Sequence, residues 1–314
     1  MRGGHAQTIC AAFLPRDVAL PAEEERLFAV DDGVQVLCRC HWQSGRADAP
    51  ALLIVHGLEG SANSQYVRGT AAKAWEAGFS VVRMNVRNCG GTERLGPTLY
   101  HSGLSGDVAT VVKQLIASEK LRRVCVAGFS MGGNQVLKMA GEFGGEAPPQ
   151  LKAVAAVCPG VDLAASADAL HLPGNRIYEY WFLWWLRLSL RRKQRLFPQR
   201  YALRGYRWLR SIRDFDDVIT APHCGFTGAD DYYARASAGP VLERIAVPTL
   251  VLHAKDDPFV RLTGTTRARM LANPNITLVE TAGGGHCGFL ADANGYDGRW
   301  AEREIVRFFR ALSR

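Results

Sequence analysis

Short apolar runs alternate with segments of helical periodicity along most of the chain. Continuous or period-2 apolar runs, the patterns of buried and half-buried strands, predict β-strands at 26–30, 34–42, 51–55, 80–85, 123–127, 153–158, 249–254 and 276–280. Apolar residues spaced three and four apart predict helices at 64–77, 107–118, 134–143, 265–271 and 301–311. Residues 1–22 show little periodicity, and we expect them to form an irregular arm.

This order of elements indicates an α/β fold. Strands that alternate with helices predict a mostly parallel central sheet that is covered by helices on both faces. The first two strands are joined at Asp31-Asp32-Gly33, a hairpin signal, and should add an antiparallel edge. Regularity breaks between two later core strands. We therefore expect a core in two parts, 1–161 and 243–314, with a helical cap inserted at 162–242.

Composition narrows the class of protein. Of the 314 residues, 47% are apolar and 22% are charged, as in soluble globular proteins. No apolar run reaches the ~18 residues of a membrane span, and the first residues lack the apolar centre of a signal peptide. The eight cysteines are scattered and show no metal-ligand spacing, which favours reduced thiols. We expect a cytoplasmic protein with no disulfide, metal or cofactor.

The net charge of +8 is concentrated in one basic segment. Between 187 and 213 there are ten basic residues and no acidic one, at 187, 191, 192, 193, 195, 200, 204, 207, 210 and 213. The rest of the chain carries 28 basic residues against 30 acidic ones and is close to neutral. A fold that is basic in only one segment gives little support to a nucleic acid partner.

A motif with chemical meaning lies between a predicted strand and a predicted helix. Gly128-Phe129-Ser130-Met131-Gly132 has the G-x-S-x-G pattern of a nucleophile elbow, in the strand–turn–helix context that the pattern requires. Its glycines permit a turn tight enough to project the Ser130 hydroxyl. The following helix directs the positive end of its dipole to the same place. We predict that Ser130 is a catalytic nucleophile.

A nucleophilic serine needs a base, and the base needs a third group to orient it. His286 follows a predicted strand and lies within a glycine-rich turn, so its backbone is free to bring the ring to Ser130. An earlier strand, 249–254, leads into Lys255-Asp256-Asp257-Pro258. Where a serine elbow of this kind has an acid partner, the usual local form at this strand is His-Gly-x-x-Asp-Pro. The stretch His253-Ala254-Lys255-Asp256-Asp257-Pro258 lines up with it and favours Asp257 as the acid. Asp256 would then be a turn residue or a supporting carboxylate.

Two backbone N–H groups should stabilise the charge that develops on the substrate oxygen. Met131, the residue after the nucleophile, is expected to supply one of them. The turn His56-Gly57-Leu58 after strand 51–55 is expected to supply the other, through the Leu58 N–H.

Further motifs extend this pattern over nearly the whole chain. They are Gly4-His5-Ala6-Gln7-Thr8-Ile9, His56-Gly57-Leu58-Glu59-Gly60, Arg87-Asn88-Cys89-Gly90-Gly91, Tyr100-His101-Ser102-Gly103, the elbow at 128–134, Phe215-Asp216-Asp217, Asp231-Tyr232-Tyr233, Asp256-Asp257-Pro258-Phe259 and Gly285-His286-Cys287-Gly288-Phe289. Together they resemble the YheT-like and ABHD-type branch of the α/β hydrolases, described as esterases or lipid hydrolases. The resemblance implies the α/β-hydrolase fold, with Ser130 as nucleophile, Asp257 as acid and His286 as base. It leaves the substrate open among short-chain esters, acylglycerols and phospholipids.

The predicted cap contains an aromatic stretch at 178–190, followed at once by Arg191-Arg192-Lys193. Such a helix packs a cap onto the core, lines an acyl pocket, or lies at a lipid surface, and the sequence leaves all three open. The acidic segment 214–217 is expected to cap a helix or to pair with the arginines, with no catalytic role.

These features favour a serine carboxylic ester hydrolase that acts on short- to medium-chain acyl esters through an acyl-enzyme, without metal. The alternative is a lipase or phospholipase that cleaves acylglycerols or phospholipids at a membrane, with the cap in peripheral contact. A non-catalytic scaffold is disfavoured because serine, aspartate and histidine are all present. The oligomeric state is not predicted.

Overall fold

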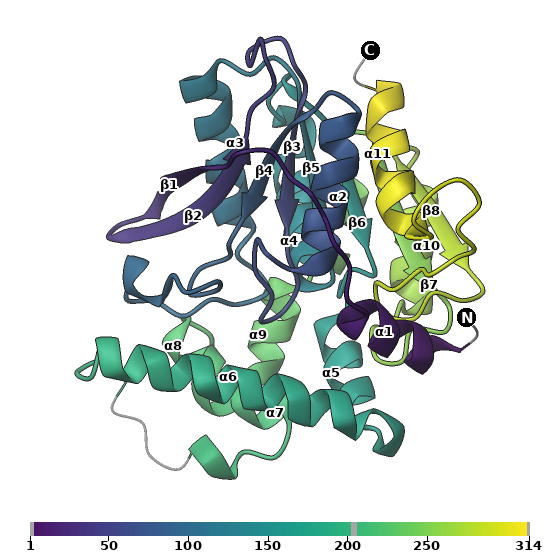
Figure 1. The fold of residues 1–314 in the computed structure, drawn as a ribbon. Coiled ribbons are helices and arrows are strands. Elements are labelled where there is room, and N and C mark those ends of the chain that lie inside the picture. The colour runs from purple at the N-terminus through teal and green to yellow at the C-terminus, as the bar shows by residue number, and fades with distance from the viewer. Residues whose placement is uncertain (1–2, 202–205, 313–314) are drawn as a thin grey trace.

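A computed structural model of the chain describes residues 3–201 and 206–312, so Arg204 of the basic segment lies outside the described residues. Its centre is an eight-stranded sheet with the order β1-β2-β4-β3-β5-β6-β7-β8 (Figure 1). Neighbours from β4 to β8 are parallel, whereas β1 and β2 form the antiparallel edge that the sequence predicts. The strands are β1 (Glu24–Asp31), β2 (Val34–His41), β3 (Ala51–Val55), β4 (Ser80–Met84), β5 (Val124–Phe129), β6 (Leu151–Val157), β7 (Thr249–Ala254) and β8 (Ile276–Thr281).

Helices cover both faces of the sheet because the side chains of each central strand alternate between two apolar layers. Leu53 and Val55 of β3 pack in the layer that contains α3 (Ser105–Glu119), α4 (Met131–Phe143) and α10 (Gly264–Ala272). Leu52 and Ile54 pack in the opposite layer, with α2 (Gln65–Glu76) and α11 (Trp300–Leu312). Burial on both faces explains why the central strands are continuous apolar runs.

The segment between β6 and β7 folds into helices that lie beyond one end of the sheet (Figure 1). The first three of these α-helices share an apolar cluster that also includes Phe259 and Val260, which follow β7, so this cluster joins them to the sheet. The last two contribute to a second apolar cluster. The helices are α5 (Leu163–His171), α6 (Arg176–Leu196), α7 (Ile212–Phe215), α8 (Ala221–His223) and α9 (Ala229–Ala236). Their assignment to a separate cap, 162–242, stays a prediction.

Part of the basic segment is used inside the fold. Lys193 is 1% exposed, and its Nζ donates to the carbonyl oxygens of Glu93, at 2.7 Å, and of Gly96. The Arg192 guanidinium pairs with the Glu93 carboxylate at 2.7 Å. These contacts fasten α6 to the loop before α3, so they serve structure and not the attraction of a polyanion.

The acidic segment caps a helix, as the sequence predicts. Asp214 forms a reciprocal capping box with Ser211 at the start of α7. Asp216 is buried and accepts hydrogen bonds from the hydroxyls of Thr220 and Tyr233.

The expectation of an irregular arm at 1–22 is wrong for its first part, because Gly4–Phe13 forms helix α1. The buried residues of α1 are Gly4, Gln7 and Thr8, whereas Phe13 is 60% exposed. An apolar stripe is the usual signal of a packed helix. Here the packed side is polar or small, so the signal is absent from the sequence.

Candidate active site

Ser130 lies in a tight turn between β5 and α4. Its φ of 53° and ψ of −117° are strained for a residue with a side chain. Neighbouring glycines permit the turn, since a Cβ at Gly128 would lie 2.2 Å from the Gly132 oxygen, and a Cβ at Gly132 would lie 2.4 Å from the His56 oxygen. The Ser130 N–H donates to Val157 of β6 at 2.9 Å. The turn therefore has the elbow conformation that the sequence predicts.

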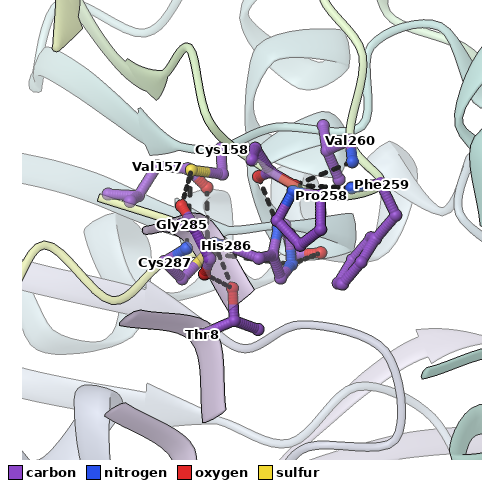
Figure 2. A network of polar contacts seen from close by, with 12 residues as sticks. Thr8, Val157, Cys158, Pro258, Phe259, Val260, Gly285, His286 and Cys287 are labelled. Atoms are coloured by element: carbon purple, nitrogen blue, oxygen red, sulfur yellow. Dashed lines mark hydrogen bonds and ion pairs between the residues drawn. The ribbon is translucent and has the colours of Figure 1, made fainter. Parts of the chain in front are cut away.

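His286 reaches Ser130 from the loop after β8. Its Nε2 lies 2.8 Å from Ser130 Oγ, and its Nδ1 lies 2.8 Å from Asp257 Oδ2. Asp257 follows β7, is 2% exposed, and accepts backbone N–H groups of Phe259 and Val260 on Oδ1 at 3.1 and 2.9 Å. Figure 2 shows His286 within this network. Three residues predicted from distant parts of the sequence are thus joined by hydrogen bonds through one imidazole ring.

Charges around the ring set its protonation. Burial disfavours the imidazolium, but the Cys287 sulfur and the Asp257 carboxylate outweigh burial and raise the pKa of His286 well above its usual value. Burial opposes ionisation of Asp257, yet His286 and the two backbone donors hold the pKa of Asp257 below its usual value. An ionised Asp257 accepts from Nδ1–H, so in the neutral ring Nε2 is the nitrogen that can receive a proton from Ser130.

Asp256 holds the loop that carries the imidazole. Its Oδ1 accepts the backbone N–H of Gly285 at 2.8 Å, one residue before His286. This contact matches the supporting role that the sequence gives Asp256 when Asp257 is the acid.

Helix α1 supports the same loop, a contribution that the sequence prediction missed. Thr8 Oγ1 accepts the His286 N–H at 2.8 Å and donates to the Gly4 carbonyl at 2.7 Å (Figure 2). The Gln7 side chain donates to the Leu290 oxygen at 3.0 Å and accepts from the Leu290 N–H at 2.6 Å. The sequence signal for this contribution was the polar motif at residues 4–9. The motif has no helical periodicity of apolar residues, so it did not predict a helix there.

Leu58 and Met131 are the residues that the sequence predicts as oxyanion donors. Both residues line a cavity with Ser130. A Cβ at Gly57, next to Leu58, would lie 3.1 Å from the Ser130 Cβ, so this turn runs close to the nucleophile. Within the described part of the chain, neither amide donates a hydrogen bond. Two N–H groups without a partner are available to a developing oxyanion, which requires such donors.

His56, in the same turn, is a structural histidine. It is fully buried, and its Nε2 accepts the Val86 N–H at 3.0 Å. Burial lowers the pKa of His56 to about 4. The ring is therefore neutral near pH 7 and holds the turn against the neighbouring loop.

Two cavities meet at Ser130. The smaller has a volume of about 130 Å³ and a mainly apolar wall that includes Leu170, Leu186 and Phe215. The larger has a volume of about 670 Å³, and residues of α1 and α6 line it together with His286. Ser130 and Leu58 belong to both walls, so an ester bound at the nucleophile has a separate space for each of its two halves.

Helix α6 contributes to both cavities and also exposes aromatic side chains. Its Phe182 lines both walls, whereas Ile177 is 67% exposed and Trp184 is 54% exposed. Trp181 packs edge-on against Phe13 of α1, with ring centroids 5.6 Å apart. The aromatic stretch thus lines a pocket and leaves an apolar surface near the larger cavity. In the ranges 3–201 and 206–312, no helix is both long and apolar enough to cross a membrane.

The fold also assembles one group with metal-ligating atoms among the described residues. The Sγ atoms of Cys158 and Cys287 and a ring nitrogen of His286 lie within 4.8 Å of one another. Sequence spacing did not reveal this group because Cys158 is 129 positions before Cys287. His286 Nε2 is already bonded to Ser130, so a metal ion there would compete with the serine for the same lone pair.

Known proteins resemble this chain in sequence and in fold. The family described as "alpha/beta hydrolase fold" matches residues 50–293. "Putative esterase YheT" of Escherichia coli is 32% identical over 96% of this chain and 88% of its own length. "Phospholipase ABHD3" of Homo sapiens is 27% identical over 98% of this chain and 76% of its own length. Among solved structures, an esterase of Pyrobaculum calidifontis superposes with a TM-score of 0.62 at 18% identity, covering 98% of this chain and 89% of that one.

Proposed function

Because the chain belongs to the α/β-hydrolase family and is a carboxylic ester hydrolase, we propose that its reaction runs through Ser130, His286 and Asp257. The observation that carries this proposal is the imidazole of His286, which bridges Ser130 Oγ and Asp257 Oδ2 with 2.8 Å hydrogen bonds on its two nitrogens. This is the geometry that a serine needs in order to become nucleophilic.

In the proposed mechanism, Ser130 Oγ attacks the ester carbonyl while His286 Nε2 takes the hydroxyl proton. Asp257 stays ionised and stabilises the imidazolium. The N–H groups of Leu58 and Met131 donate to the oxyanion. The imidazolium then protonates the departing alcohol, which leaves an acyl group on Ser130. A water molecule, deprotonated by His286, releases the acid and restores the serine.

The two cavities suggest how the substrate is oriented. Because His286 must protonate the alcohol, the alcohol half should occupy the larger cavity, whose wall contains His286. The acyl half then enters the smaller cavity, whose wall holds Leu58 and Met131 but not His286. Its volume of about 130 Å³ is below the ~300–1,000 Å³ of typical ligand pockets. The proposed substrates are therefore esters of short- to medium-chain acids with room for a bulky alcohol.

A fluorophosphonate probe tests the mechanism. We expect it to label the wild-type serine and to fail with Ser130→Ala and with His286→Ala. Labelling that persists in Ser130→Ala would assign the nucleophile elsewhere.

Substrate orientation is tested with p-nitrophenyl acetate, butyrate, octanoate and palmitate. The value of kcat/KM should fall at least about tenfold from butyrate to palmitate, as expected when a pocket excludes added methylenes. Leu186→Ala, which removes bulk from the wall of the smaller cavity, should move the optimum to longer chains, and Leu186→Met serves as the matched control. An unchanged chain-length profile in Leu186→Ala would contradict the placement of the acyl chain.

The exposed aromatic surface of α6 supports a second candidate, an enzyme that cleaves lipid esters at a membrane. Trp184 lines neither cavity. Trp184→Ala should therefore reduce hydrolysis of phosphatidylcholine vesicles and leave hydrolysis of p-nitrophenyl butyrate unchanged. Equal rates for wild type and variant on vesicles would reject this candidate.

A further inference from the structure

Two cysteines from different parts of the chain meet beside the proposed base. Cys158 directly follows β6, and Cys287 directly follows His286 (Figure 2). The Cys287 N–H lies 3.5 Å from Cys158 Sγ, and Cys287 Sγ lies 3.6 Å from the oxygen of Val157. The two Sγ atoms are within 4.8 Å of each other. Each thiol therefore lies against the backbone of the other residue's segment.

The pair is held by tertiary contacts and not by local preference. Cys158 has φ 43° and Cys287 has φ 58°, both in the left-handed region that residues with a Cβ rarely adopt. Such conformations persist where the surrounding structure enforces them. Here the Cys158 N–H donates to Leu252 of β7 at 2.8 Å, and the His286 loop is bound to α1. These contacts hold the two cysteine side chains next to each other.

The two thiols differ in access and reactivity. Cys287 lines the larger cavity together with Ser130 and His286, whereas Cys158 is 0% exposed. Burial disfavours the Cys287 thiolate, but hydrogen bonding with Cys158 and the charge of His286 outweigh burial and lower the pKa of Cys287 to about 6. Burial raises the pKa of Cys158 well above its usual value. An oxidant that enters the cavity should therefore meet a reactive thiolate first and a protected thiol behind it.

We propose that Cys287 and Cys158 form an oxidisable thiol pair, in which a peroxide modifies Cys287 and Cys158 resolves it to a disulfide. In the first step the Cys287 thiolate attacks one peroxide oxygen and the O–O bond breaks. Sulfur is oxidised to a sulfenic acid, and the other oxygen leaves as water after it takes a proton. In the second step the Cys158 sulfur attacks the Cys287 sulfur and the S–O bond breaks. The thiol proton leaves with hydroxide as a second water. A dithiol reductant reverses the modification.

Oxidation should switch off the ester hydrolase, a consequence that rests on the proposed function. Cys287 Sγ lies 3.9 Å from His286 Nε2. The sulfurs must approach to about 2.05 Å to bond, so Cys287 must turn or its loop must move. The preceding residue holds a 2.8 Å hydrogen bond to Ser130. A displacement of about 1 Å there costs on the order of a hundredfold in rate.

The test treats wild-type protein, Cys158→Ser, Cys287→Ser and Cys224→Ser with hydrogen peroxide in the presence of EDTA. Cys224 is a matched control because it is only partly buried, and burial raises the pKa of its thiol to about 12. Peptide mass spectrometry after alkylation should find a 158–287 cross-link in wild type and in Cys224→Ser. In both proteins the rate of ester hydrolysis should fall at least about tenfold relative to the same protein without peroxide, and dithiothreitol should restore it.

The other two variants separate the steps. Cys158→Ser should stop at a sulfenic acid on Cys287 that dimedone traps, and Cys287→Ser should keep its own untreated rate in peroxide. Absence of the cross-link in oxidised wild type, or equal loss of activity in Cys287→Ser, would overturn the proposal. The cross-link is read without any ester. A protein that cross-links but never hydrolyses esters would therefore refute the proposed function alone.

Discussion

The choice between two adjacent carboxylates decides how the proposed base works. In Asp257, Oδ1 receives the N–H groups of Phe259 and Val260, and Oδ2 faces His286 Nδ1. In Asp257→Asn the two backbone donors will select the amide oxygen at the Oδ1 position, because only an oxygen accepts there. The NH₂ group must then face Nδ1.

This reversal forces the imidazole into the wrong tautomer. Nδ1 becomes the acceptor, Nε2 carries the hydrogen, and no lone pair remains for the Ser130 proton. Loss of this orientation in a serine–histidine–aspartate arrangement lowers kcat by roughly 10⁴, or about 5.5 kcal/mol in the barrier. Asp256→Asn keeps an amide oxygen for the Gly285 N–H. We expect it to lose less than about tenfold, since a neutral acceptor weakens that hydrogen bond by about 1 kcal/mol.

The assay is steady-state hydrolysis of p-nitrophenyl butyrate by both variants at one pH, with thermal unfolding as the control for folding. A larger loss in Asp256→Asn than in Asp257→Asn would refute the reasoning. A loss of less than tenfold in a folded Asp257→Asn would also refute it, because the wrong tautomer leaves Nε2 without a lone pair for the Ser130 proton.

Three further predictions address the support of the site. Thr8→Val removes the acceptor for the His286 N–H and should lower kcat about tenfold with little change in KM. Thr8→Ser is the control and should keep the activity. Equal rates for wild type and Thr8→Val would show that α1 does not position the base. Cys287→Ala removes negative charge beside His286, so the pKa of His286 should fall. Because the base acts when neutral, the acid limb of the pH profile of kcat/KM should move to lower pH. An acid limb that stays in place or moves to higher pH would contradict this. Gly132→Ala places a Cβ 2.4 Å from a backbone oxygen and should lower Tm by about 5 °C or more. Gly145→Ala is the control, because its Cβ meets no atom within 4 Å. Equal Tm values for the two variants would refute the steric argument.

The sequence by itself determined the sheet, because buried parallel strands must be apolar on both faces and therefore stand out as short continuous runs. The runs at 51–55 and 249–254 coincide with β3 and β7. Local chemistry also identified the turn at Ser130, since its glycines and the flanking strand and helix are sequence neighbours. Strand ends, which parallel topology gathers at one edge, indicated His286 and the pair Asp256-Asp257, and the local motif favoured Asp257 as the acid.

Only the tertiary structure decided which polar groups meet across large sequence separations. Helix α1 has no apolar stripe because its packed side bonds to the loop of His286, more than 270 residues later. Likewise, nothing near Cys158 or Cys287 indicates a pair, since their contact is made by two loops that the sheet brings together. Periodicity records how a segment buries apolar surface. The partner of a hydrogen bond or a thiol depends on the packing of the whole fold.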